Sequence, residues 1–316
     1  MNPIPRIIHQ TWKTRDLPED YAKYRDSVLR HHLDWDHWLW TDRDNREFIA
    51  REHRWFLPTY DSYKHEIERV DAVRYFILYT HGGVYIDLDM ECVQPIDALL
   101  PGDGRPSFSM LASPGIDNAT IGNAYMAAPP GHAFFAWLTR RLPHLRERDI
   151  THADVLNNTG PDMIAAQLAA YGQFGRYHVV ELEKICGRSV LGEHPAFAGM
   201  TEQAIRESGL LYLIHHHSNS WNIQHPVPGE LAGYELFVDT DLEGGDIDYV
   251  EYAAGDYKTI AAVCDASDEA IAFNFNGYIK NAGGRLVAVS TDNHWLKPGM
   301  RAWVCVKKAR LGELRR

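Results

Sequence analysis

The sequence predicts an α/β protein with a smaller β-rich module at its C-terminal end. Up to about residue 225, strand-like segments rich in β-branched residues alternate with helical segments, a pattern typical of a sheet covered by helices. After residue 229 the segments are short, strand-like and separated by glycine, aspartate and asparagine. With 316 residues, the chain is long enough for one large domain and one small one. We therefore expect an α/β domain at residues 1–229 and a β-rich module at residues 230–316.

The composition narrows the classes of function. Hydrophobic residues make up 45% and charged residues 24% of the chain, as in ordinary globular proteins. The formal net charge of -11 repels a phosphate backbone, so we expect no nucleic-acid partner. A nucleotide held through a metal ion is compatible with that charge. No segment approaches the roughly 20 apolar residues of a membrane-spanning helix.

The cysteines and the N-terminus indicate a compartment. Four cysteines lie without paired spacing, which is typical of free thiols in a reducing environment: Cys92, Cys186, Cys264 and Cys305. The opening segment "MNPIPRIIHQTW" lacks the apolar core and the small-residue cleavage site of a signal peptide. We therefore expect a cytoplasmic protein.

The first elements follow from local patterns. Pro18 suits the start of a helix, and Asp42 or Asp44 would cap the helix after it. We expect strands at residues 4–12 and 35–41 and helices at residues 17–33 and 42–53.

The segment 64–80 predicts a helix that leads directly into a strand. Its apolar residues recur in steps of three and four, from Ile67 to Ile77. Gly82 and Gly83 would end the helix, because glycine readily takes the left-handed conformation common at helix C-termini.

The strand predicted at residues 84–90 alternates between two faces. Its residues divide into an apolar face with Val84, Ile86 and Leu88, and a second face with Tyr85, Asp87 and Asp89.

Later segments continue the alternation. We expect strands at 107–112, 121–129, 177–183 and 210–217, with helices at 132–142 and 160–171. In the C-terminal module we expect strands at 234–240, 247–253, 259–265, 270–280, 285–291 and 301–308.

Asp87 and Asp89 form one of five Asp-x-Asp pairs; the others are Asp34/Asp36, Asp42/Asp44, Asp239/Asp241 and Asp246/Asp248. Two carboxylates held close on a buried strand repel each other unless a cation lies between them. Mg²⁺ or Mn²⁺ would relieve that repulsion and leave positions open for a diphosphate. The alternative is a solvated strand end or a turn cap, which we expect for the other four pairs.

The preceding helix supplies a second pair of functional groups. Asp71 and Arg74 are three residues apart and share a helix face. The arginine fork can hold phosphate or sugar hydroxyls, and the carboxylate can accept from hydroxyls. The alternative is an ordinary surface ion pair.

Four blocks of the sequence resemble, in order, glycosyltransferase family 32. They are "IPRIIHQTW", "RVDAVRYFILYTHGGVYIDLDMECVQPID", "TGPDMI" and "IHHHSNSW", within residues 4 to 222. That family includes yeast-type α-mannosyltransferases and bacterial sugar transferases with a DXD motif. The clostridial glucosylating toxins share the Asp-x-x-Arg helix, the Gly-Gly-Val-Tyr turn and the Asp-x-Asp strand. The resemblance implies a GT-A fold that binds a nucleotide-sugar.

The resemblance also implies roles for the central residues. Asp71 and Arg74 would contact the donor sugar, and Tyr85 would lie beside the nucleoside. Asp87 and Asp89 would meet the ribose, the metal and the diphosphate. These aspartates and Arg74 would carry the chemistry, with Mn²⁺ or Mg²⁺ as cofactor.

The block "HHHSNSW" is expected to complete the site. His215 is our choice of third metal ligand, with His216 next, and a neutral imidazole suits Mn²⁺. Ser220 and Trp221 would close over the diphosphate and sugar. The alternative for the triplet is a strand end with one buried ring and two solvated rings.

Two further residues are weaker candidates for donor binding. Asn123 lies where family members place a polar strand near the donor sugar, although a structural asparagine is equally compatible. Trp12 would stack on the nucleotide base, or would be a core tryptophan.

The leading hypothesis is a retaining, metal-dependent transferase that moves a hexose from a UDP- or GDP-sugar to a hydroxyl of a glycan or glycolipid. The setting would be envelope polysaccharide synthesis at the inner face of a membrane, with peripheral association. One alternative is a phosphohydrolase of the haloacid dehalogenase type, whose first aspartate is a nucleophile. Another is an inactive carbohydrate-binding protein. The sequence does not predict the oligomeric state.

Overall fold

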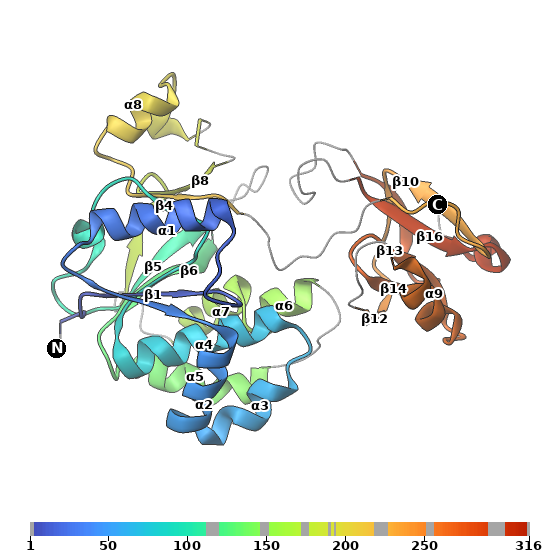
Figure 1. Cartoon of the computed structure of the whole chain (residues 1–316), viewed down its shortest axis with the longest axis horizontal. Helices are drawn as coiled ribbons and strands as arrows, with labels where there is room; N and C mark the ends of the chain where they lie inside the picture. The colour runs from blue at the N-terminus through green and yellow to red at the C-terminus, as the bar shows by residue number, and fades with distance from the viewer. Residues whose placement is uncertain are drawn as a thin grey trace. The chain divides into compact units, whose positions relative to one another are not determined.

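The computed structural model describes residues 3–111, 120–145, 152–171, 177–188, 191–192, 194–217, 227–250, 256–289 and 301–314. Two compact units are present: the first takes up almost all of the chain to His217, and the second the chain beyond it (Figure 1). The boundary expected at residues 229/230 stays a prediction.

A six-stranded mixed sheet forms the centre of the first unit. Its strands, in spatial order, are β2 (Asp36–Trp40), β1 (Ile7–Thr11), β3 (Gly83–Ile86), β6 (Thr120–Ala128), β5 (Ser107–Leu111) and β7 (His178–Val180). Strands β2, β1 and β3 are parallel, and β6 runs antiparallel to both β3 and β5. The predicted α/β class, with a mixed central sheet, is confirmed, and so is the additional β-rich region.

The two faces of the sheet bury different cores. Along β3, Val84 and Ile86 pack on the side of helix α1 (Glu19–His31), whereas Tyr85 packs on the other side. That other side is covered by helices α2 (Asp42–Glu52), α3 (Leu57–Ser62), α4 (Glu66–His81), α5 (Ala133–Leu145) and α7 (Pro161–Ala170) (Figure 1). Helices α6 (His152–Asn158) and α8 (Glu202–Glu207) complete the unit.

Helix α4 lies at the centre of the packing. It is buried without interruption from Asp71 to Leu78, around its whole circumference, which the apolar stripe in the sequence did not predict. It ends at Gly82, as predicted, with φ +66°. Gly83 follows with φ +92°, and a Cβ there would lie 2.5 Å from the carbonyl oxygen of Ile7. Only glycine therefore allows α4 to turn this closely into β3.

The strand predicted at residues 84–90 is interrupted, which corrects the single-strand prediction. Strand β3 ends at Ile86, and Met90 begins β4 (Met90–Cys92) in a second sheet of order β4-β9-β8, with β9 (Leu213–His215) and β8 (Ile185–Gly187). The amide of Asp87 still donates to Ala124, but the amide of Met90 turns back to the Asp87 carbonyl at 3.1 Å. Asp87 and Asp89 therefore belong to the connection between two sheets.

The second unit contains a five-stranded antiparallel sheet and a two-stranded one. The five strands, in order, are β10 (Tyr234–Val238), β16 (Trp303–Lys307), β13 (Ala270–Asn274), β14 (Tyr278–Asn281) and β12 (Asp246–Tyr249); β11 (Thr240–Glu243) pairs with β15 (Arg285–Ala288). The strand predicted at 259–265 is wrong, because this segment is helix α9 (Tyr257–Asp265). Its buried residues Ile260, Ala261 and Cys264 follow helical spacing. Asp246 and Asp248 lie in strand β12, not in a turn.

Helix α2 is capped differently from the prediction. The N-cap of α2 is Thr41, not an aspartate, and Asp44 accepts from the Thr41 amide in a capping box. The four cysteines are free and buried. Among the described residues, no helix has the length and apolar character needed to cross a membrane. Short 3-10 helices occur at Arg54–Phe56, Ile96–Leu99, Pro195–Phe197 and Lys308–Glu313.

Candidate functional site

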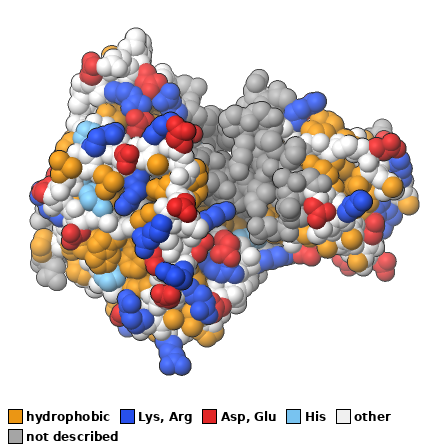
Figure 2. All heavy atoms as spheres, viewed as in Figure 1, with side chains coloured by type: hydrophobic (Ala, Val, Ile, Leu, Met, Phe, Trp, Pro, Cys, Tyr) orange, Lys and Arg blue, Asp and Glu red, His pale blue; other side chains and the backbone are white. Residues whose placement is uncertain are grey.

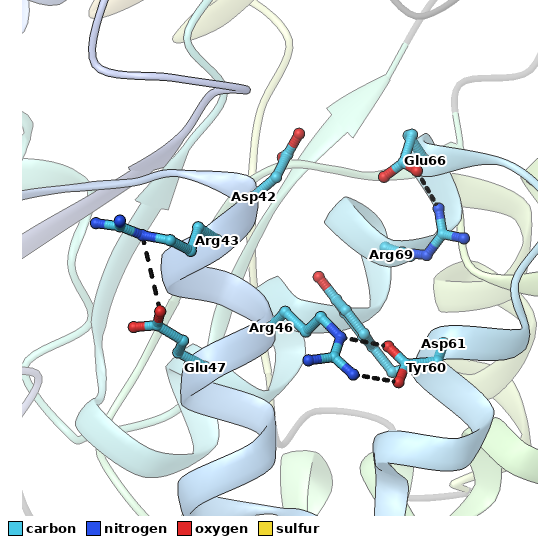
Figure 3. Close-up of a pocket in the computed structure, with 8 residues that line it drawn as sticks. All are labelled: Asp42, Arg43, Arg46, Glu47, Tyr60, Asp61, Glu66 and Arg69. Atoms are coloured by element: carbon cyan, nitrogen blue, oxygen red, sulfur yellow. Dashed lines mark hydrogen bonds and ion pairs between the residues drawn. The ribbon is translucent and has the colours of Figure 1, made fainter.

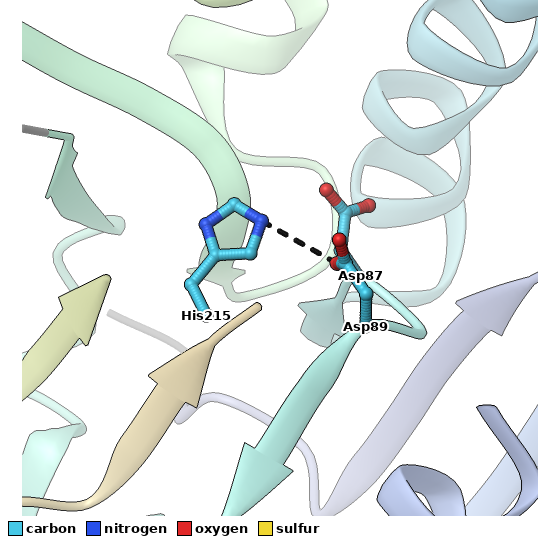
Figure 4. Close-up of side chains that lie close together, drawn as sticks. All are labelled: Asp87, Asp89 and His215. Atoms are coloured by element: carbon cyan, nitrogen blue, oxygen red, sulfur yellow. Dashed lines mark ion pairs between the residues drawn. The ribbon is translucent and has the colours of Figure 1, made fainter. Parts of the chain in front are cut away.

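The connection between β3 and β4 meets the end of β9. Because β4 and β9 are antiparallel, with Met90 opposite His215, the strand pairing brings His215 beside the two aspartates. One potential ligand atom from each of Asp87, Asp89 and His215 lies within 4.8 Å of the others. The Nε2 atom of His215 is 3.4 Å from Oδ1 of Asp89, and Figure 4 shows the ring turned toward the carboxylates.

The charges in this cluster favour a cation. Burial raises the pKa of Asp87; the Arg74 guanidinium opposes this rise and the Asp89 carboxylate adds to it. Burial by itself would lower the pKa of His215. The nearby Asp89 and Asp87 carboxylates together outweigh that effect, so the pKa is raised. Two carboxylates and one imidazole are donors that Mn²⁺ accepts, and a divalent ion would offset the repulsion between the carboxylates. The residues present therefore fit the expected metal.

Arg74 joins the cluster to helix α4. Its guanidinium lies 3.0 Å from Oδ1 of Asp71 and 3.1 Å from Oδ1 of Asp87, and it donates to the carbonyl of Asn123 at 3.0 Å. The same guanidinium lies 4.5 Å from the centre of the Tyr85 ring. Only 3% of the Arg74 side chain and 7% of the Asp71 side chain are exposed, so the surface ion pair offered as an alternative is excluded.

Asp71 accepts hydrogen bonds from two other elements. Asn123 of β6 donates to Oδ1 at 3.0 Å, and Thr159, between α6 and α7, donates to Oδ2 at 3.4 Å. Burial raises the pKa of Asp71 to about 7, although Arg74 opposes that shift. Tyr75 supports the same network by donating to the carbonyl of Thr159 at 2.6 Å. The network holds the Asp71 carboxylate in one orientation.

Sequence reasoning missed two members of this network. Tyr75 is four residues after Asp71, so its place on the same helix face could have been predicted from helical spacing. Thr159 opens the block "TGPDMI", but its bond to Asp71 could not have been predicted, because the two residues are 88 positions apart in the sequence.

The three consecutive histidines have different surroundings. His215 faces Asp89, whereas His216 donates to Oε2 of Glu91 at 3.1 Å and stacks on Tyr24 with ring centres 4.1 Å apart. The ring of His217 lies 3.8 Å from that of His215. The geometry therefore brings His215 into the cluster and directs His216 to other partners. The role of His215 as a metal ligand stays a prediction.

The remaining residues predicted to bind the donor include Tyr85, Trp12, Ser220 and Trp221. Tyr85 is fully buried, and its hydroxyl is 2.7 Å from Oγ1 of Thr11. Trp12 is partly buried, with its ring 4.4 Å from that of Tyr21. Ser220 and Trp221 lie outside the described residues. Their roles toward a donor, like that of Asn123, stay predictions.

A separate cavity of about 520 Å³ is formed by α2, α3 and α4 (Figure 3). Its lining residues are Asp42, Arg43, Arg46, Glu47, Tyr60, Asp61, Glu66 and Arg69. Its three arginines are each paired with an acid, as in Arg46 with Asp61 at 2.7 Å. Mixed charge of this kind also covers the visible face of the molecule (Figure 2). None of the predicted site residues lines the cavity.

Comparison with known proteins finds similar sequences over part of the chain. Residues 18–105 match the family described as "Glycosyltransferase sugar-binding region containing DXD motif". Inositol phosphoceramide mannosyltransferase 3 of Schizosaccharomyces pombe is 44% identical over 160 residues, covering 50% of this chain and 43% of that protein. Mannosyl phosphorylinositol ceramide synthase CSH1 of Saccharomyces cerevisiae is 41% identical over 169 residues, covering 53% of this chain and 43% of that protein.

The match therefore spans less than half the length of these relatives. Among solved structures, a glycosyltransferase involved in glycosylation of the major capsid of PBCV-1 is similar with a TM-score of 0.42 and 12% identity. The similarity covers 68% of this chain and 93% of that one. The fold assignment rests on the sheet topology described above. The predicted resemblance to the DXD-motif glycosyltransferases is confirmed by the sequence matches.

Proposed function

We propose that this chain, whose residues 18–105 match the sugar-binding region of DXD-motif glycosyltransferases, is itself a metal-dependent glycosyltransferase. It would move a hexose from a nucleotide diphosphate sugar to a hydroxyl of a glycolipid or glycan, with retention of configuration. One observation carries the proposal: Asp87, Asp89 and His215 come within 4.8 Å of one another beside the buried Asp71–Arg74 pair.

Each part of the cluster suits one part of a nucleotide-sugar. Asp87, Asp89 and His215 would hold Mn²⁺ or Mg²⁺, and such an ion neutralises the charge that develops on a leaving diphosphate. Arg74 adds a fixed positive charge at the same point, because Asp71 and Asp87 hold its guanidinium on two sides. Asp71, held by Asn123 and Thr159, would accept from sugar hydroxyls and orient the donor.

The two relatives suggest which hexose and which acceptor are used. One is named an inositol phosphoceramide mannosyltransferase and the other a mannosyl phosphorylinositol ceramide synthase. We therefore take mannose as the transferred sugar, with GDP- or UDP-mannose as donor, and a glycolipid as the acceptor. A role in envelope polysaccharide synthesis is the corresponding proposal for a glycan acceptor.

The two alternative functions have less support. In a haloacid dehalogenase-type phosphohydrolase the first aspartate attacks phosphorus. Here Asp87 is paired with Arg74 at 3.1 Å, and the relative from Schizosaccharomyces pombe is named a mannosyltransferase. An inactive binding protein would have no need for the metal cluster. Asp71, Arg74, Asp87 and Asp89 are all present, and the structure brings them together.

The experiment is a nucleotide-release assay with Mn²⁺ and a panel of UDP- and GDP-sugars that includes GDP-mannose. We expect release with one donor, and a loss of about 10² to 10³ in rate for Asp89→Ala. Asp36→Ala is the matched control, since Asp36 belongs to another Asp-x-Asp pair and is exposed. Failure to bind or turn over any donor with any divalent metal would overturn the proposal. Release of phosphate from simple esters would favour the hydrolase.

A cytoplasmic setting at the inner face of a membrane is also part of the proposal, because a glycolipid acceptor would be available there. Sedimentation of the protein with vesicles that contain acceptor lipid tests it. Recovery of all the protein in the supernatant would count against peripheral association.

A further inference from the structure

A second charged cluster lies beside the candidate metal site. The guanidinium of Arg206, on helix α8, binds the carboxylate of Glu91 through two bonds of 2.7 and 3.1 Å. The same carboxylate accepts from Nε2 of His216 at 3.1 Å. About a quarter of each of the Glu91 and Arg206 side chains is exposed, so water weakens this pair only in part.

His216 is held from two directions. Its ring stacks on Tyr24 of α1, with centres 4.1 Å apart and planes inclined by 17°, while Glu91 binds its Nε2. A histidine fixed by both a stacked ring and a charged acceptor has little rotational freedom. These contacts anchor His216 to α1 and β4, and so restrict where its backbone can lie.

The backbone of His216 is linked to both sides of the metal site. Its amide donates to the carbonyl of Asp89 at 3.0 Å, and a peptide bond joins it to His215. The spacing between Asp89 and His215 therefore depends on where His216 lies. Glu91 sets that position from β4, only two residues beyond Asp89.

We propose that Glu91 is a positioning residue for the metal site. Together with Arg206 and His216, it holds the end of β9 against the β3–β4 connection. Nε2 of His215 then lies 3.4 Å from Oδ1 of Asp89, close enough for both atoms to bind one ion. The inference rests on the proposed function and deepens it, because it adds a supporting layer to the same site. Residues that orient metal ligands in this way change metal affinity by about 10- to 100-fold when they are replaced.

Glu202 provides a matched control. Its carboxylate binds the same arginine at 3.0 Å and also pairs with Arg188, but the bonds described for His216 do not involve it. Replacing Glu202 removes an ion pair of Arg206 and leaves the Glu91–His216 bond in place. The two glutamates therefore separate positioning of the ligands from general stabilisation of α8.

The experiment measures Mn²⁺ binding to the full chain by electron paramagnetic resonance, with the ¹⁴N modulation of bound Mn²⁺ as a sign of imidazole coordination. We expect Glu91→Gln to weaken binding by about 10- to 100-fold and to reduce the ¹⁴N signal. Glu202→Gln should stay close to the parent protein in both measurements. Glu91→Asp, which keeps the charge, should recover part of the affinity.

Two results would overturn the inference: unchanged affinity in Glu91→Gln, or an equal loss in Glu91→Gln and Glu202→Gln. If circular dichroism shows that Glu91→Gln does not fold, His216→Phe replaces it, because this change removes the bond to Glu91 and keeps a ring on Tyr24. Unchanged affinity there has the same meaning. If the unaltered chain binds no Mn²⁺, the proposed function fails and the inference fails with it. If the chain binds Mn²⁺ and loses it in Asp89→Ala but not in Glu91→Gln, only the inference fails.

Discussion

The guanidinium of Arg74 lies 3.1 Å from the carboxylate of Asp87, although the two residues come from a helix and from the connection after a strand. The same guanidinium binds Asp71 at 3.0 Å, so one buried cation serves two carboxylates. This arrangement ties the central helix to the cluster of Asp87, Asp89 and His215. We therefore expect Arg74 to contribute to stability and, under the proposed function, to activity.

Arg74→Met is expected to destabilise the protein by about 3 to 5 kcal/mol, because the buried carboxylate of Asp71 and the partly buried carboxylate of Asp87 lose their shared cation. Nucleotide release should fall with it. Urea unfolding and the release assay measure the two effects. The control is Arg43→Met on α2, whose i,i+4 pair with Glu47 is exposed and should contribute almost nothing. Equal unfolding midpoints for the two variants would contradict the structural role of Arg74.

His215→Ala is expected to lower Mn²⁺ affinity by about 10²-fold, since the imidazole would be one of three protein ligands. Equilibrium titration with Mn²⁺ provides the measurement. His144→Ala serves as control, because His144 is exposed near the end of α5. If His215→Ala binds Mn²⁺ as tightly as the His144 variant, the ligand lies elsewhere in the histidine block.

His9 gives a pH dependence of stability. Burial lowers its pKa to about 3; the carbonyl of Gly82, which accepts from Nε2 at 2.9 Å, opposes the shift, and His81 adds to it. The unfolded chain therefore binds more protons than the native one between pH 6.5 and about 3, and stability falls as the pH falls through that window. The loss is at most about 1.4 kcal/mol for each pH unit.

His9→Gln should remove this component, because glutamine can still donate near the Nε2 position but does not titrate. Urea unfolding of both proteins between pH 7 and pH 4 gives the comparison, and other titrating groups cancel in the difference. An identical pH slope for the two proteins would show that His9 is not the cause.

Gly83→Ala is expected to destabilise the protein by more than about 3 kcal/mol, because a positive φ is combined with a clash against Ile7. Gly131→Ala is the control: Gly131 has φ +70° and open space around the Cβ position, so it should cost only about 1 kcal/mol. Thermal unfolding separates the two. Similar midpoints would mean that β1 can move away from β3 at little cost.

Much of the site was predictable because its parts are adjacent in the sequence. The helix with Asp71 and Arg74, the two glycines and the two aspartates occupy residues 71 to 89. Helical spacing also places Tyr75 on the same face as Asp71. Thr159 and Asn123 come from distant segments, and their bonds to Asp71 depend on how α6, α7 and β6 pack on α4.

Two elements were predicted wrongly because contacts between distant segments, rather than local pattern, decide their structure. The alternation of residues 84–90 continues through Asp87 and Asp89, but hydrogen bonding moves the chain to a second sheet at Met90. Residues 259–265 contain β-branched residues and are short, so local preference does not exclude a strand. Ile260 and Cys264 are buried in the core of the second unit, and this packing stabilises the helix α9.

The sequence by itself determined the α/β class, the helix that ends at Gly82, and the central pattern of Asp71, Arg74, Asp87 and Asp89. These features depend on spacing, on glycine geometry and on the order of residues along the chain. Only the tertiary structure decided that Asp89 meets His215, that Arg74 is buried against Asp87, and that His216 binds Glu91. The reason is physical: pairing of β4 with β9, more than 100 residues away in the sequence, sets the contacts of His215 and His216. Packing of α4 against β3 and β6 sets the contact between Arg74 and Asp87.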